Sequence, residues 1–570
     1  MTAVHAEIEI KYAVDDAFEL PSLPTLAAGA QAGTPLVEGE VLTHRLEATY
    51  YDTPDLLLAR AHLTLRRRTG GDDAGWHLKI PGADESRQEI RVPLGRAVST
   101  VPAALRRMVR AQLRGQALVP VGRITTERTE HHLVDATGQV VVEVADDKVE
   151  AQRLRPTSHN GTAAADKVSW RELEVELRNG DRELLSTIDA GLRELGLQVA
   201  PSRSKLGRLL GVDAEPETGN EPGEDAGKDA GKAAAKAAGH EAAQDAGEAA
   251  AKVAGKGAGG KGAGKKAARR AAEKAAGKTS PAGEVVLRYV GAQLGQILAN
   301  DPQVRVDASG SVHQMRVATR RLRSALRTFG PVLDKQVVTP LRPELKWLAA
   351  QLGVARDAEV MRERLVEAVQ AQQTELPGQS VVPALDHRMS DAYGTAREGL
   401  LRELDSERYH LLVDRLHALV ADPPLTEDAS APASDVLPRR ARRAYRALAK
   451  QVDAAHDAPN GAERDTHLHE ARKAAKKARY AGETLAEVFG KRATTFAAAM
   501  ETLQEELGEH QDSVVMRARL VELAQEDATV EAAFAYGRLH AQEEERGARA
   551  VARFEDSWKK ASRKSVRSWM

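Results

Sequence analysis

The sequence predicts a multidomain α+β protein, in which a mainly antiparallel β region is followed by an all-α region. Charged and apolar residues alternate with period two up to about residue 213. From about residue 283 onward, apolar residues instead recur with a period near 3.6. An abrupt change of composition separates the two patterns, and 570 residues suffice for several compact domains.

Composition excludes several classes of protein. The chain has no cysteine, which rules out disulfides, thiolate metal sites and a cysteine nucleophile. Lys and Arg (82) balance Asp and Glu (83), so affinity for a polyanion must come from local clusters of charge. No apolar run approaches the roughly 20 residues that cross a bilayer, and the first residues lack a signal-sequence pattern. We therefore expect a soluble, cytoplasmic protein with no membrane partner.

Strict alternation predicts strands in the first region. Residues 7–12 read Glu-Ile-Glu-Ile-Lys-Tyr and residues 171–177 read Arg-Glu-Leu-Glu-Val-Glu-Leu. Shorter alternating runs cover 63–68, 76–80, 88–92 and 140–144, and helical patterns cover 103–113 and 182–195. One face of each strand is apolar enough to pack under helices, which favours a sheet curled around a charged interior.

The charged faces of these strands suggest a site for metal and phosphate. Glu7 and Glu9 share one face of the first strand, while Glu172, Glu174 and Glu176 share one face of the late strand. Arg66 and Arg68 project together on another strand. Clustered carboxylates offer hard oxygen ligands to Mg²⁺ or Mn²⁺, and Arg and Lys contact phosphate. The pattern alone also allows solvated strand faces with cross-strand ion pairs.

Taken in order, these motifs resemble those of the CYTH superfamily, the triphosphate tunnel metalloenzymes. The resemblance opens with Glu7-x-Glu9-x-Lys11 and covers about 210 residues. It continues through Tyr50-Tyr51-Asp52-Thr53-Pro54, Leu65-Arg66-x-Arg68, Lys79, Arg87-x-Glu89, Arg123, Glu143 to Asp147, Glu172-x-Glu174-x-Glu176 and Ser204-Lys205. It implies that residues 1–213 form an eight-stranded antiparallel β-barrel tunnel with flanking helices.

The resemblance also implies roles for individual residues. The implied catalytic set is Glu7, Glu9, Lys11, Glu174 and Glu176. The implied ligands of Mg²⁺ or Mn²⁺ are Glu7, Glu9, Glu174, Glu176 and one or both of Asp146 and Asp147, between which the sequence does not choose. The implied phosphate contacts are Lys11, Arg66, Arg68, Lys79, Arg87, Arg123 and Lys205. Thr64 would face the tunnel without an evident role.

Residues 214–282 are nearly all Ala, Gly, Lys, Asp and Glu, with no aromatic residue. Such a segment cannot bury enough apolar surface to offset its ordering entropy, so we expect a disordered linker. A basic arm that touches phosphates, and binds nucleic acid weakly, is the alternative. The segment lacks the aromatic residues of stacking platforms, which makes nucleic acid an unlikely partner.

The α region contains an internal repeat. Helical patterns cover 285–298, 311–326, 341–352, 358–371, 438–452, 466–489 and 496–507. His313-x-x-Arg316-x-x-x-Arg320-x-x-Arg323 recurs as His469-x-x-Arg472-x-x-x-Lys476-x-x-Arg479, with each set on one helical face. Leu352-Gly353-x-x-x-Asp357 recurs as Leu507-Gly508-x-x-x-Asp512. The nearly constant offset predicts two copies of one helical unit, although a solvated basic face is the simpler interpretation of each stripe.

Both copies resemble the CHAD domain, the conserved histidine α-helical domain that is often fused behind CYTH. The resemblance covers residues 283–570 and implies two pseudo-symmetric helical bundles whose basic helices bind inorganic polyphosphate. The implied contacts are His313, Arg316, Arg320, Arg323, His469, Arg472, Lys473, Lys476 and Arg479. Neither histidine has a metal-ligand spacing, so we expect both to serve as donors to phosphate or to its ligands.

These observations predict a divalent-metal-dependent hydrolase that converts inorganic tripolyphosphate to diphosphate and phosphate, joined to a domain that binds long-chain polyphosphate. Hydrolysis of thiamine triphosphate and class IV adenylyl cyclase activity are the alternatives within the superfamily. A non-catalytic polyphosphate-binding or granule-associated protein is the alternative from another class. Two Glu-x-Glu pairs argue against the last, because anion binding alone needs no carboxylates.

Overall fold

The computed structural model describes residues 3–28, 36–82, 87–95, 100–156, 162–211, 280–370, 381–526 and 530–570. The chain divides into two compact units, each described here by itself. The β unit comprises residues 1–224 with 301–308, and the helical unit comprises residues 225–300 with 309–570. Residues 212–279, which include most of the predicted linker, lie outside the described residues, so the predicted domain boundaries stay a prediction.

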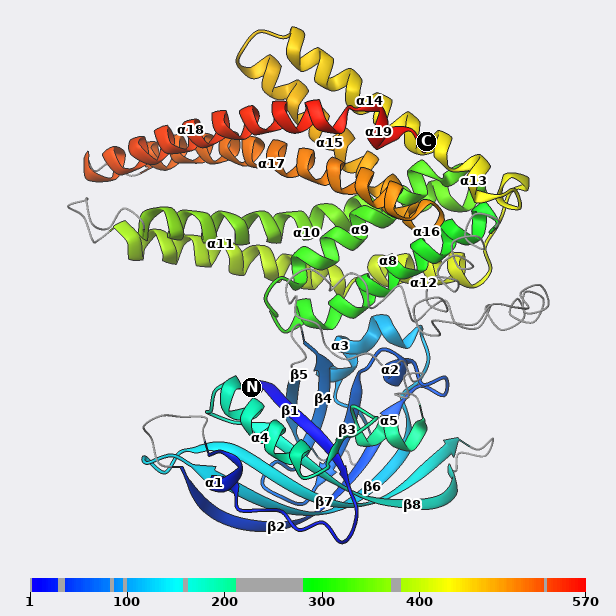
Figure 1. Ribbon diagram of the computed structural model, residues 1–570, viewed down its shortest axis with the longest axis vertical. Coiled ribbons are helices and arrows are strands. Elements are labelled where there is room, and N and C mark those ends of the chain that lie inside the picture. Colours follow the sequence, from blue (N-terminus) through cyan, green and yellow to red (C-terminus); the bar gives the residue numbers. More distant parts are fainter. Residues whose placement is uncertain are drawn as a thin grey trace, which may run out of the picture. The chain divides into compact units, whose positions relative to one another are not determined.

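Eight antiparallel strands of the β unit close into a barrel (Figure 1), which confirms the predicted fold. Around the barrel the order is β5-β4-β3-β2-β6-β7-β8-β1, and pairing of β1 with β5 closes it. A two-residue strand, β9 (Gln198–Val199), lies beside β1. The barrel strands are β1 (Ala3–Val14), β2 (Val37–Asp52), β3 (Thr64–Thr69), β4 (Gly75–Pro81), β5 (Arg87–Pro93), β6 (Val119–Val134), β7 (Val140–Pro156) and β8 (Thr162–Leu177).

Strand β1 pairs with two different neighbours along its length. Residues 3–7 pair with β5, and residues 8–14 pair with β8. In this register Glu9 lies opposite Glu176, and Lys11 lies opposite Glu174. Because side chains alternate along a strand, these charged residues face the barrel interior while Ile8 and Ile10 face outward.

Helices cover the outward apolar faces of the barrel. Helix α4 (Arg182–Glu194) buries Leu184, Ile188 and Leu192 in a cluster with Leu173 and Val175 of β8. Asp181 caps this helix by accepting a hydrogen bond from the Leu184 amide at 2.8 Å. Helix α3 (Ala103–Leu113) packs in a second cluster over β3, β4 and β5. Both helices confirm the helical patterns predicted there, and short helices α1 (Leu23–Leu26), α2 (Leu57–Arg60) and α5 (Lys205–Leu210) complete the unit.

The turn after β2 is held by one buried carboxylate. The Asp52 side chain is fully buried and accepts hydrogen bonds from the backbone amides of Thr53 (2.6 Å), Leu58 (2.8 Å) and Ala59 (2.8 Å). It thereby fastens α2 to the end of the strand that carries Tyr50 into the interior.

We expect Asp52→Ala to destabilise the β unit by at least about 3 kcal/mol, because it leaves three inward amides without an acceptor. The measurement is the shift of the thermal unfolding transition of the full chain. Asp55→Ala is the matched control, since Asp55 is exposed. An equal shift in both variants would contradict the role of the Asp52 carboxylate.

The helical unit is built from two series of helices that follow the predicted repeat. In the first series α9 (Ser311–Thr328) packs on α10 (Lys335–Gln370), which packs on α11 (Val381–Leu404). In the second, α15 (Ala462–Thr484) packs on α17 (Lys491–Glu526), which packs on α18 (Val530–Ala561). Figure 1 shows α10 beside α11, and α17 beside α18. The remaining helices are α8 (Ala282–Arg305), α12 (Glu407–Ala421), α13 (Ala433–Val436), α14 (Pro438–Asp457), α16 (Ala486–Phe489) and α19 (Lys564–Arg567), with 3-10 turns at Gly330–Val332 and Glu427–Ala429.

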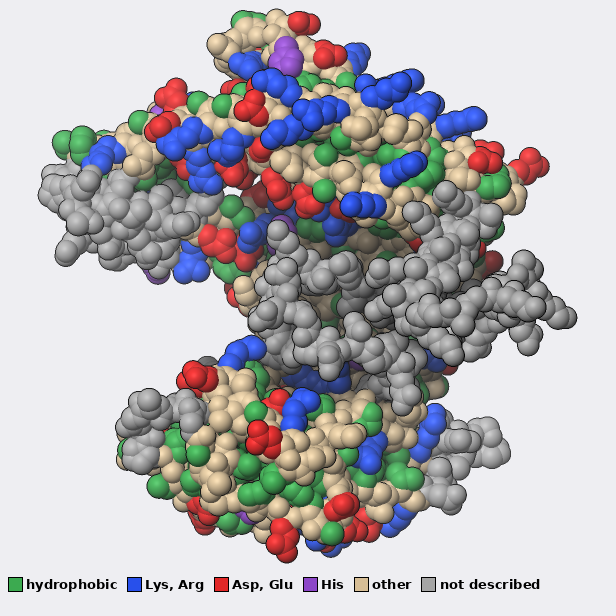
Figure 2. Space-filling view, in the orientation of Figure 1, with side chains coloured by type: hydrophobic (Ala, Val, Ile, Leu, Met, Phe, Trp, Pro, Cys, Tyr) green, Lys and Arg blue, Asp and Glu red, His purple; other side chains and the backbone are tan. Residues whose placement is uncertain are grey.

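Helix α14 exposes a row of cations along one side. Arg439, Arg443, Arg446 and Lys450 recur at helical spacing and are all exposed. Figure 2 shows Lys and Arg side chains gathered on this part of the helical unit. Among the residues that the structure describes, no helix is both long and apolar enough to cross a membrane.

Candidate functional site

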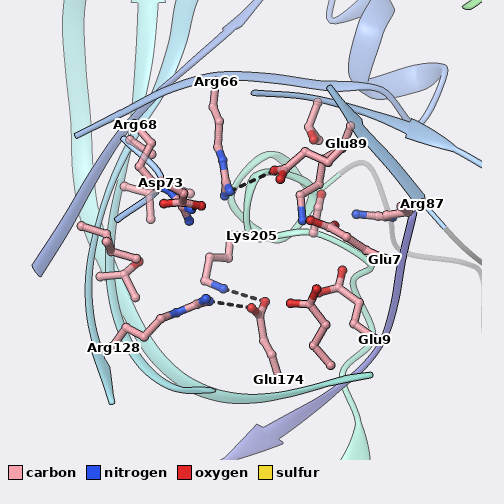
Figure 3. Close-up of a pocket in the computed structure, with 18 of the residues that line it drawn as sticks. Glu7, Glu9, Arg66, Arg68, Asp73, Arg87, Glu89, Arg128, Glu174 and Lys205 are labelled. Carbon is pink, nitrogen blue, oxygen red and sulfur yellow. Dashed lines mark hydrogen bonds and ion pairs between the residues drawn. The ribbon is translucent and has the colours of Figure 1, made fainter. Parts of the chain in front are cut away.

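The barrel encloses a cavity of about 790 Å³, its open ends included, and charged side chains dominate its lining (Figure 3). Strands β1, β3, β4, β5, β6 and β8 all contribute charged residues, because their inner faces carry the charged half of each alternating pattern. The charged lining residues are Glu7, Glu9, Lys11, Arg66, Arg68, Asp73, Lys79, Arg87, Glu89, Arg91, Arg128, Glu174, Glu176, Arg178 and Lys205.

One wall of the cavity, which we call the carboxylate wall, consists of Glu7, Glu9, Glu174 and Glu176 on β1 and β8. Glu9 and Glu176 lie directly opposite each other, and like charges in that position repel. Burial would raise the pKa of Glu9, but Lys11 and Lys79 lower it to about 2. Burial raises the pKa of Glu176 to about 7, since Arg178 compensates it only in part. Glu7 is paired with Lys79, and Glu174 is paired with Lys11, Arg128 and Lys205. The wall thus offers clustered oxygen ligands of the kind that Mg²⁺ or Mn²⁺ takes, with its unmet negative charge centred on Glu176.

Arg66, Arg68 and Arg128 form a group of cations that we call the cation wall, and it meets the carboxylate wall where Arg128 bonds Glu174 at 2.7 Å (Figure 3). Arg66 lies 3.5 Å from the Glu89 carboxylate, and Arg68 pairs with Asp73. Burial lowers the pKa of Arg68 to about 9, and the charges of Arg66 and Arg128 act in the same direction. Despite burial, Tyr50 and Glu89 raise the pKa of Arg66, and Asp147 and Glu174 raise that of Arg128, so the shortage of negative charge is confined to Arg68. A cavity lined by both clustered carboxylates and arginines suits a metal-bound polyphosphate.

Lys205 occupies a buried group of carboxylates next to the cavity. Ser204 caps α5 by accepting a hydrogen bond from the Gly207 amide at 2.9 Å, which sets the position of the following lysine. The Lys205 ammonium then lies 2.7–2.8 Å from Asp147, Glu172 and Glu174. Burial would lower the pKa of Lys205, but these carboxylates raise it well above its ordinary value. Its three N–H donors already have partners in this arrangement.

The helical unit contains a second charged site, on α9 and α15. Arg316 pairs with Asp357 at 2.9 Å, and its counterpart Arg472 lies 4.0 Å from Asp512. A Cβ on Gly353 would lie 3.5 Å from the Arg316 guanidinium, and one on Gly508 would lie 3.1 Å from that of Arg472. In each copy of the Leu-Gly-x-x-x-Asp motif, the glycine therefore leaves space for the arginine of the basic helix, and the aspartate one turn later pairs with it.

Cations from the two repeats meet between α9 and α15. We call Arg316, Arg320, Arg472 and Lys476 the cationic cluster. Burial lowers the pKa of Lys476 to about 6, and Arg320, Arg472 and Arg316 contribute in the same direction. Burial and neighbouring arginines likewise lower the pKa of Arg320. Cations that depress one another's pKa in this way form a site that favours an anion.

Family models match residues 5–201 as a CYTH domain and residues 288–521 as a CHAD domain. The chain is also 34% identical over 581 residues to an uncharacterized protein of Mycobacterium tuberculosis, a match that covers 99% of this chain and 98% of that protein. The chain belongs to the CYTH–CHAD family. The β unit thus carries the CYTH domain, a triphosphate-tunnel domain of triphosphatase type, and the helical unit carries the CHAD domain.

Further similarities are partial. A segment of 47 residues is 53% identical to the thiamine-triphosphatase of Macaca fascicularis, covering 8% of this chain and 19% of that protein. PptA from Streptomyces chartreusis matches with 24% identity and a TM-score of 0.42, covering 49% of this chain and all of that chain. The CHAD domain from Ricinus communis matches with 27% identity and a TM-score of 0.39, covering 49% of this chain and 92% of that chain.

The CYTH cavity brings together most residues that the sequence singled out. Its lining includes Thr64 and the predicted residues Glu7, Glu9, Lys11, Arg66, Arg68, Lys79, Arg87, Glu174, Glu176 and Lys205. Arg123 does not belong to it, because this side chain is exposed on β6, whereas Arg128 of the same strand lines the cavity. Asp147 faces the interior and pairs with Arg128 at 2.6 Å. Asp146 has the opposite phase and pairs with Arg171 at 2.7 Å, so it lies away from the carboxylate wall.

Five charged lining residues were not predicted as site residues: Asp73, Glu89, Arg91, Arg128 and Arg178, of which Glu89 belongs to a quoted motif that gave it no role. Strand alternation could have identified two of them. Arg178 lies on the same strand face as Glu172, Glu174 and Glu176, and Arg91 lies on the same face as Arg87 and Glu89. Strand β6 is polar on both faces around Arg128, so its phase was ambiguous. Asp73 lies in a turn, where no periodicity applies.

The CHAD residues predicted from the repeat differ in their surroundings. Arg479 is held by Glu483 at 2.7 Å and by Glu501 at 2.8 Å, which favours a structural role. Lys473 is exposed and pairs with Glu470 at 2.6 Å. His313 and His469 begin the two stripes, and burial together with nearby cations lowers the pKa of both. The cationic cluster is therefore the strongest candidate for a polyphosphate contact.

Proposed function

We propose that the CYTH domain hydrolyses inorganic triphosphate with a divalent metal, and that the CHAD domain binds longer polyphosphate. The observation that supports the first part is that one cavity is lined by both clustered carboxylates and arginines. A metal-free phosphate site would need no carboxylates, and a simple metal site would need no row of arginines.

In this proposal each wall has its own task. Arg66, Arg68 and Arg128 bind phosphate oxygens and neutralise the charge of the chain, and Lys79 and Arg87 extend the grip toward β1. Glu7, Glu9, Glu174 and Glu176 would hold Mg²⁺ or Mn²⁺. When bound, the metal supplies a polarised, more acidic water and neutralises charge on the transferred phosphoryl group.

Thiamine triphosphate is the second candidate substrate, because the chain matches a short segment of a thiamine-triphosphatase. The lining argues against it. Among the described residues that line the cavity, Tyr50 is the single aromatic one, so the rings of thiamine lack a stacking pair. The lining thus supports the smaller, purely anionic substrate.

The test is phosphate release by the full chain from tripolyphosphate, ATP and thiamine triphosphate, each with Mg²⁺, Mn²⁺ or EDTA. We expect tripolyphosphate to be hydrolysed fastest and EDTA to stop the reaction. Binding of tripolyphosphate without any hydrolysis would instead support a non-catalytic polyphosphate protein.

Loss of an arginine from the cation wall should weaken substrate binding. We expect Arg66→Ala and Arg68→Ala each to cost about 1.5–3 kcal/mol, the scale of a hydrogen bond to a charged group, seen as a lower kcat/KM for tripolyphosphate. Arg67→Ala is the matched control, because Arg67 lies between them on β3 and points to the other face. A similar loss in all three variants would mean that general charge, not the cavity, binds the substrate.

Polyphosphate binding by the CHAD domain is supported by the cationic cluster, which gathers four positive groups from two helices. A flexible polyanion gains affinity from such repeated contacts because each neutralised phosphate releases counterions. Filter binding or calorimetry with the full chain and long-chain polyphosphate, with metal chelated, tests this part separately from hydrolysis.

The affinity for polyphosphate should fall as pH rises from about 6 to about 8. The Lys476 ammonium, with its pKa near 6, is mostly neutral above that pH in the free protein and must take up a proton when the anion binds. Below about pH 6 it is already charged, so the affinity levels off. The measurement is binding at constant ionic strength in wild type and Lys476→Arg, whose guanidinium stays charged. An unchanged pH slope in Lys476→Arg would assign the proton uptake to another group.

A further inference from the structure

A group of histidine and carboxylate side chains faces the barrel interior beyond the residues that line the cavity. We call His44, Glu130, His132 and Glu143 the histidine cluster. We infer that this cluster binds a divalent metal of the zinc type, at a site separate from the carboxylate wall. The inference does not depend on the proposed triphosphatase activity.

The strand register brings the four residues to one place. His132 of β6 lies directly opposite Glu143 of β7, and Glu130 is two residues before His132 on the same face. His44 of β2 lies opposite Arg128, the residue that precedes Glu130 on that face. Because Arg128 lines the cavity, the whole group faces inward. Three adjacent strands of a closed barrel thus hold the ligands, which limits how far they can move apart.

The distances between ligand atoms suit a metal better than hydrogen bonds. Ligand atoms of Glu130, His132 and Glu143 all lie within 4.8 Å of one another. His132 Nε2 lies 3.9 Å from Glu143 Oε2, and His44 Nε2 lies 3.6 Å from Glu130 Oε2. Both separations are too long for hydrogen bonds. A tetrahedral ion with bonds of 2.0–2.1 Å places its ligand atoms about 3.3–3.4 Å apart, so Glu130, His132 and Glu143 need to contract by up to roughly 1.4 Å. His44 approaches Glu130 and would have to move toward the other two residues to complete the set.

The charges of the cluster are also less satisfied than those of the other candidate group. Within the residues that the structure describes, Asp147, Glu172 and Glu174 form a second set of potential metal ligands, but Lys205 pairs with all three. In the histidine cluster Arg178 bonds Oε2 of Glu143 at 2.7 Å, and Arg128 remains 4.0 Å from Glu130. One arginine therefore serves Glu143 and, at 2.8 Å, also Glu176. A divalent ion would supply the missing positive charge.

The donor types decide which metal fits. One imidazole with two carboxylates, and a second imidazole next to Glu130, suit borderline ions such as Zn²⁺ or Co²⁺, whereas an all-carboxylate set suits Mg²⁺ or Mn²⁺. The barrel would thus bind a zinc-type ion at the histidine cluster and Mg²⁺ or Mn²⁺ at the neighbouring carboxylate wall. The two sites are linked through Arg178, and Glu143 lies opposite Glu176 across β7 and β8.

The test uses the full chain, stripped with a chelator and titrated with Zn²⁺ by calorimetry and with Co²⁺ by visible absorption. Four single variants are compared with the wild type. His132→Gln and His44→Gln each remove an imidazole ligand. His131→Gln is the matched control, because His131 precedes His132 on β6 with its side chain on the other face. Glu9→Gln alters the carboxylate wall alone.

We expect the tightest Zn²⁺ site of the wild type to persist with similar affinity in His131→Gln and in Glu9→Gln, since the carboxylate wall offers oxygen ligands only. The affinity should fall by at least about tenfold in His132→Gln and in His44→Gln, since even groups that only support a ligand change it by roughly 10–100-fold. Bound Co²⁺ should show the strong visible bands of a tetrahedral site, and the His132→Gln spectrum should lose them. Loss of the ion in Glu9→Gln, equal loss in His131→Gln, or no loss in His132→Gln would each overturn the inference.

Discussion

The Glu9→Gln variant should lose hydrolysis of tripolyphosphate by at least about a hundredfold, the scale seen when one group that stabilises transition-state charge is removed. The amide keeps the size of the side chain and can still accept the hydrogen bond that Lys11 donates at 2.9 Å. It cannot supply the negative charge that the carboxylate wall needs for Mg²⁺ or Mn²⁺. The change would therefore remove a proposed metal ligand without opening a hole in the barrel.

The measurement is phosphate release over a range of metal concentrations, together with metal-free binding of tripolyphosphate. Binding should persist in Glu9→Gln, because the cation wall is intact. Glu150→Gln on β7 is the control, since that carboxylate is 65% exposed and pairs only loosely with Lys167, at 3.5 Å. Wild-type turnover by Glu9→Gln at saturating metal would exclude Glu9 from the metal site.

Replacing the whole cationic cluster should abolish the binding of long-chain polyphosphate. The variant carries Arg316→Ala, Arg320→Ala, Arg472→Ala and Lys476→Ala. If each of these side chains contributes about 1.5–3 kcal/mol, removing even two of them lowers the affinity by more than about a hundredfold. The dependence of affinity on salt should flatten as well, by about 0.7 in the log–log slope for each phosphate that the protein no longer neutralises.

Helix α14 provides a control with the same number of charges removed. Arg439, Arg443, Arg446 and Lys450 are exposed on its outer side, and their replacement by Ala removes four positive charges as well. We expect this second variant to keep nearly wild-type affinity, and the wild type to prefer polyphosphate to duplex DNA at equal salt. Equal losses in the two variants would show that net charge, rather than the arrangement between α9 and α15, binds the polymer.

The parts of the fold that follow from a single period could be predicted. Alternation at Glu7–Lys11 and Glu172–Glu176 placed the carboxylate wall on inner strand faces, and helical spacing located α9 and α15. Asp147 rather than Asp146 could also have been chosen, because Val142 and Val144 share the outward phase of Asp146. The inward position of Arg128 could not be predicted from the sequence, since the residues around it on β6 are polar on both faces. Which face of β6 points inward is set by its pairing with the neighbouring strands β2 and β7.

The same difference between a local pattern and a tertiary contact explains where a predicted helix boundary was wrong. The patterns at 341–352 and 358–371 suggested two helices, because glycine at 353 weakens a helix by about 1 kcal/mol. The structure has one continuous helix, α10, in which that glycine gives Arg316 the space it needs. Tertiary contact with another helix thus outweighs local propensity, and no single-segment pattern contains that information. The repeat indicated that this glycine has a packing role, since Gly508 lies against Arg472 as Gly353 lies against Arg316.

The double pairing of β1 ties ligand binding to folding. This strand joins β5, some 80 residues away in the chain, to β8, roughly 160 residues away, and it also carries Glu7, Glu9 and Lys11. Contacts so distant in sequence form slowly, because a long loop must be closed first. Until β1 docks, half of the carboxylate wall does not exist, so a metal-bound polyphosphate has no complete site on an open sheet. A ligand that binds only the closed barrel stabilises it by mass action, about 2.7 kcal/mol at a hundred times its Kd. The substrate of this barrel therefore also acts as a ligand that favours its folded state.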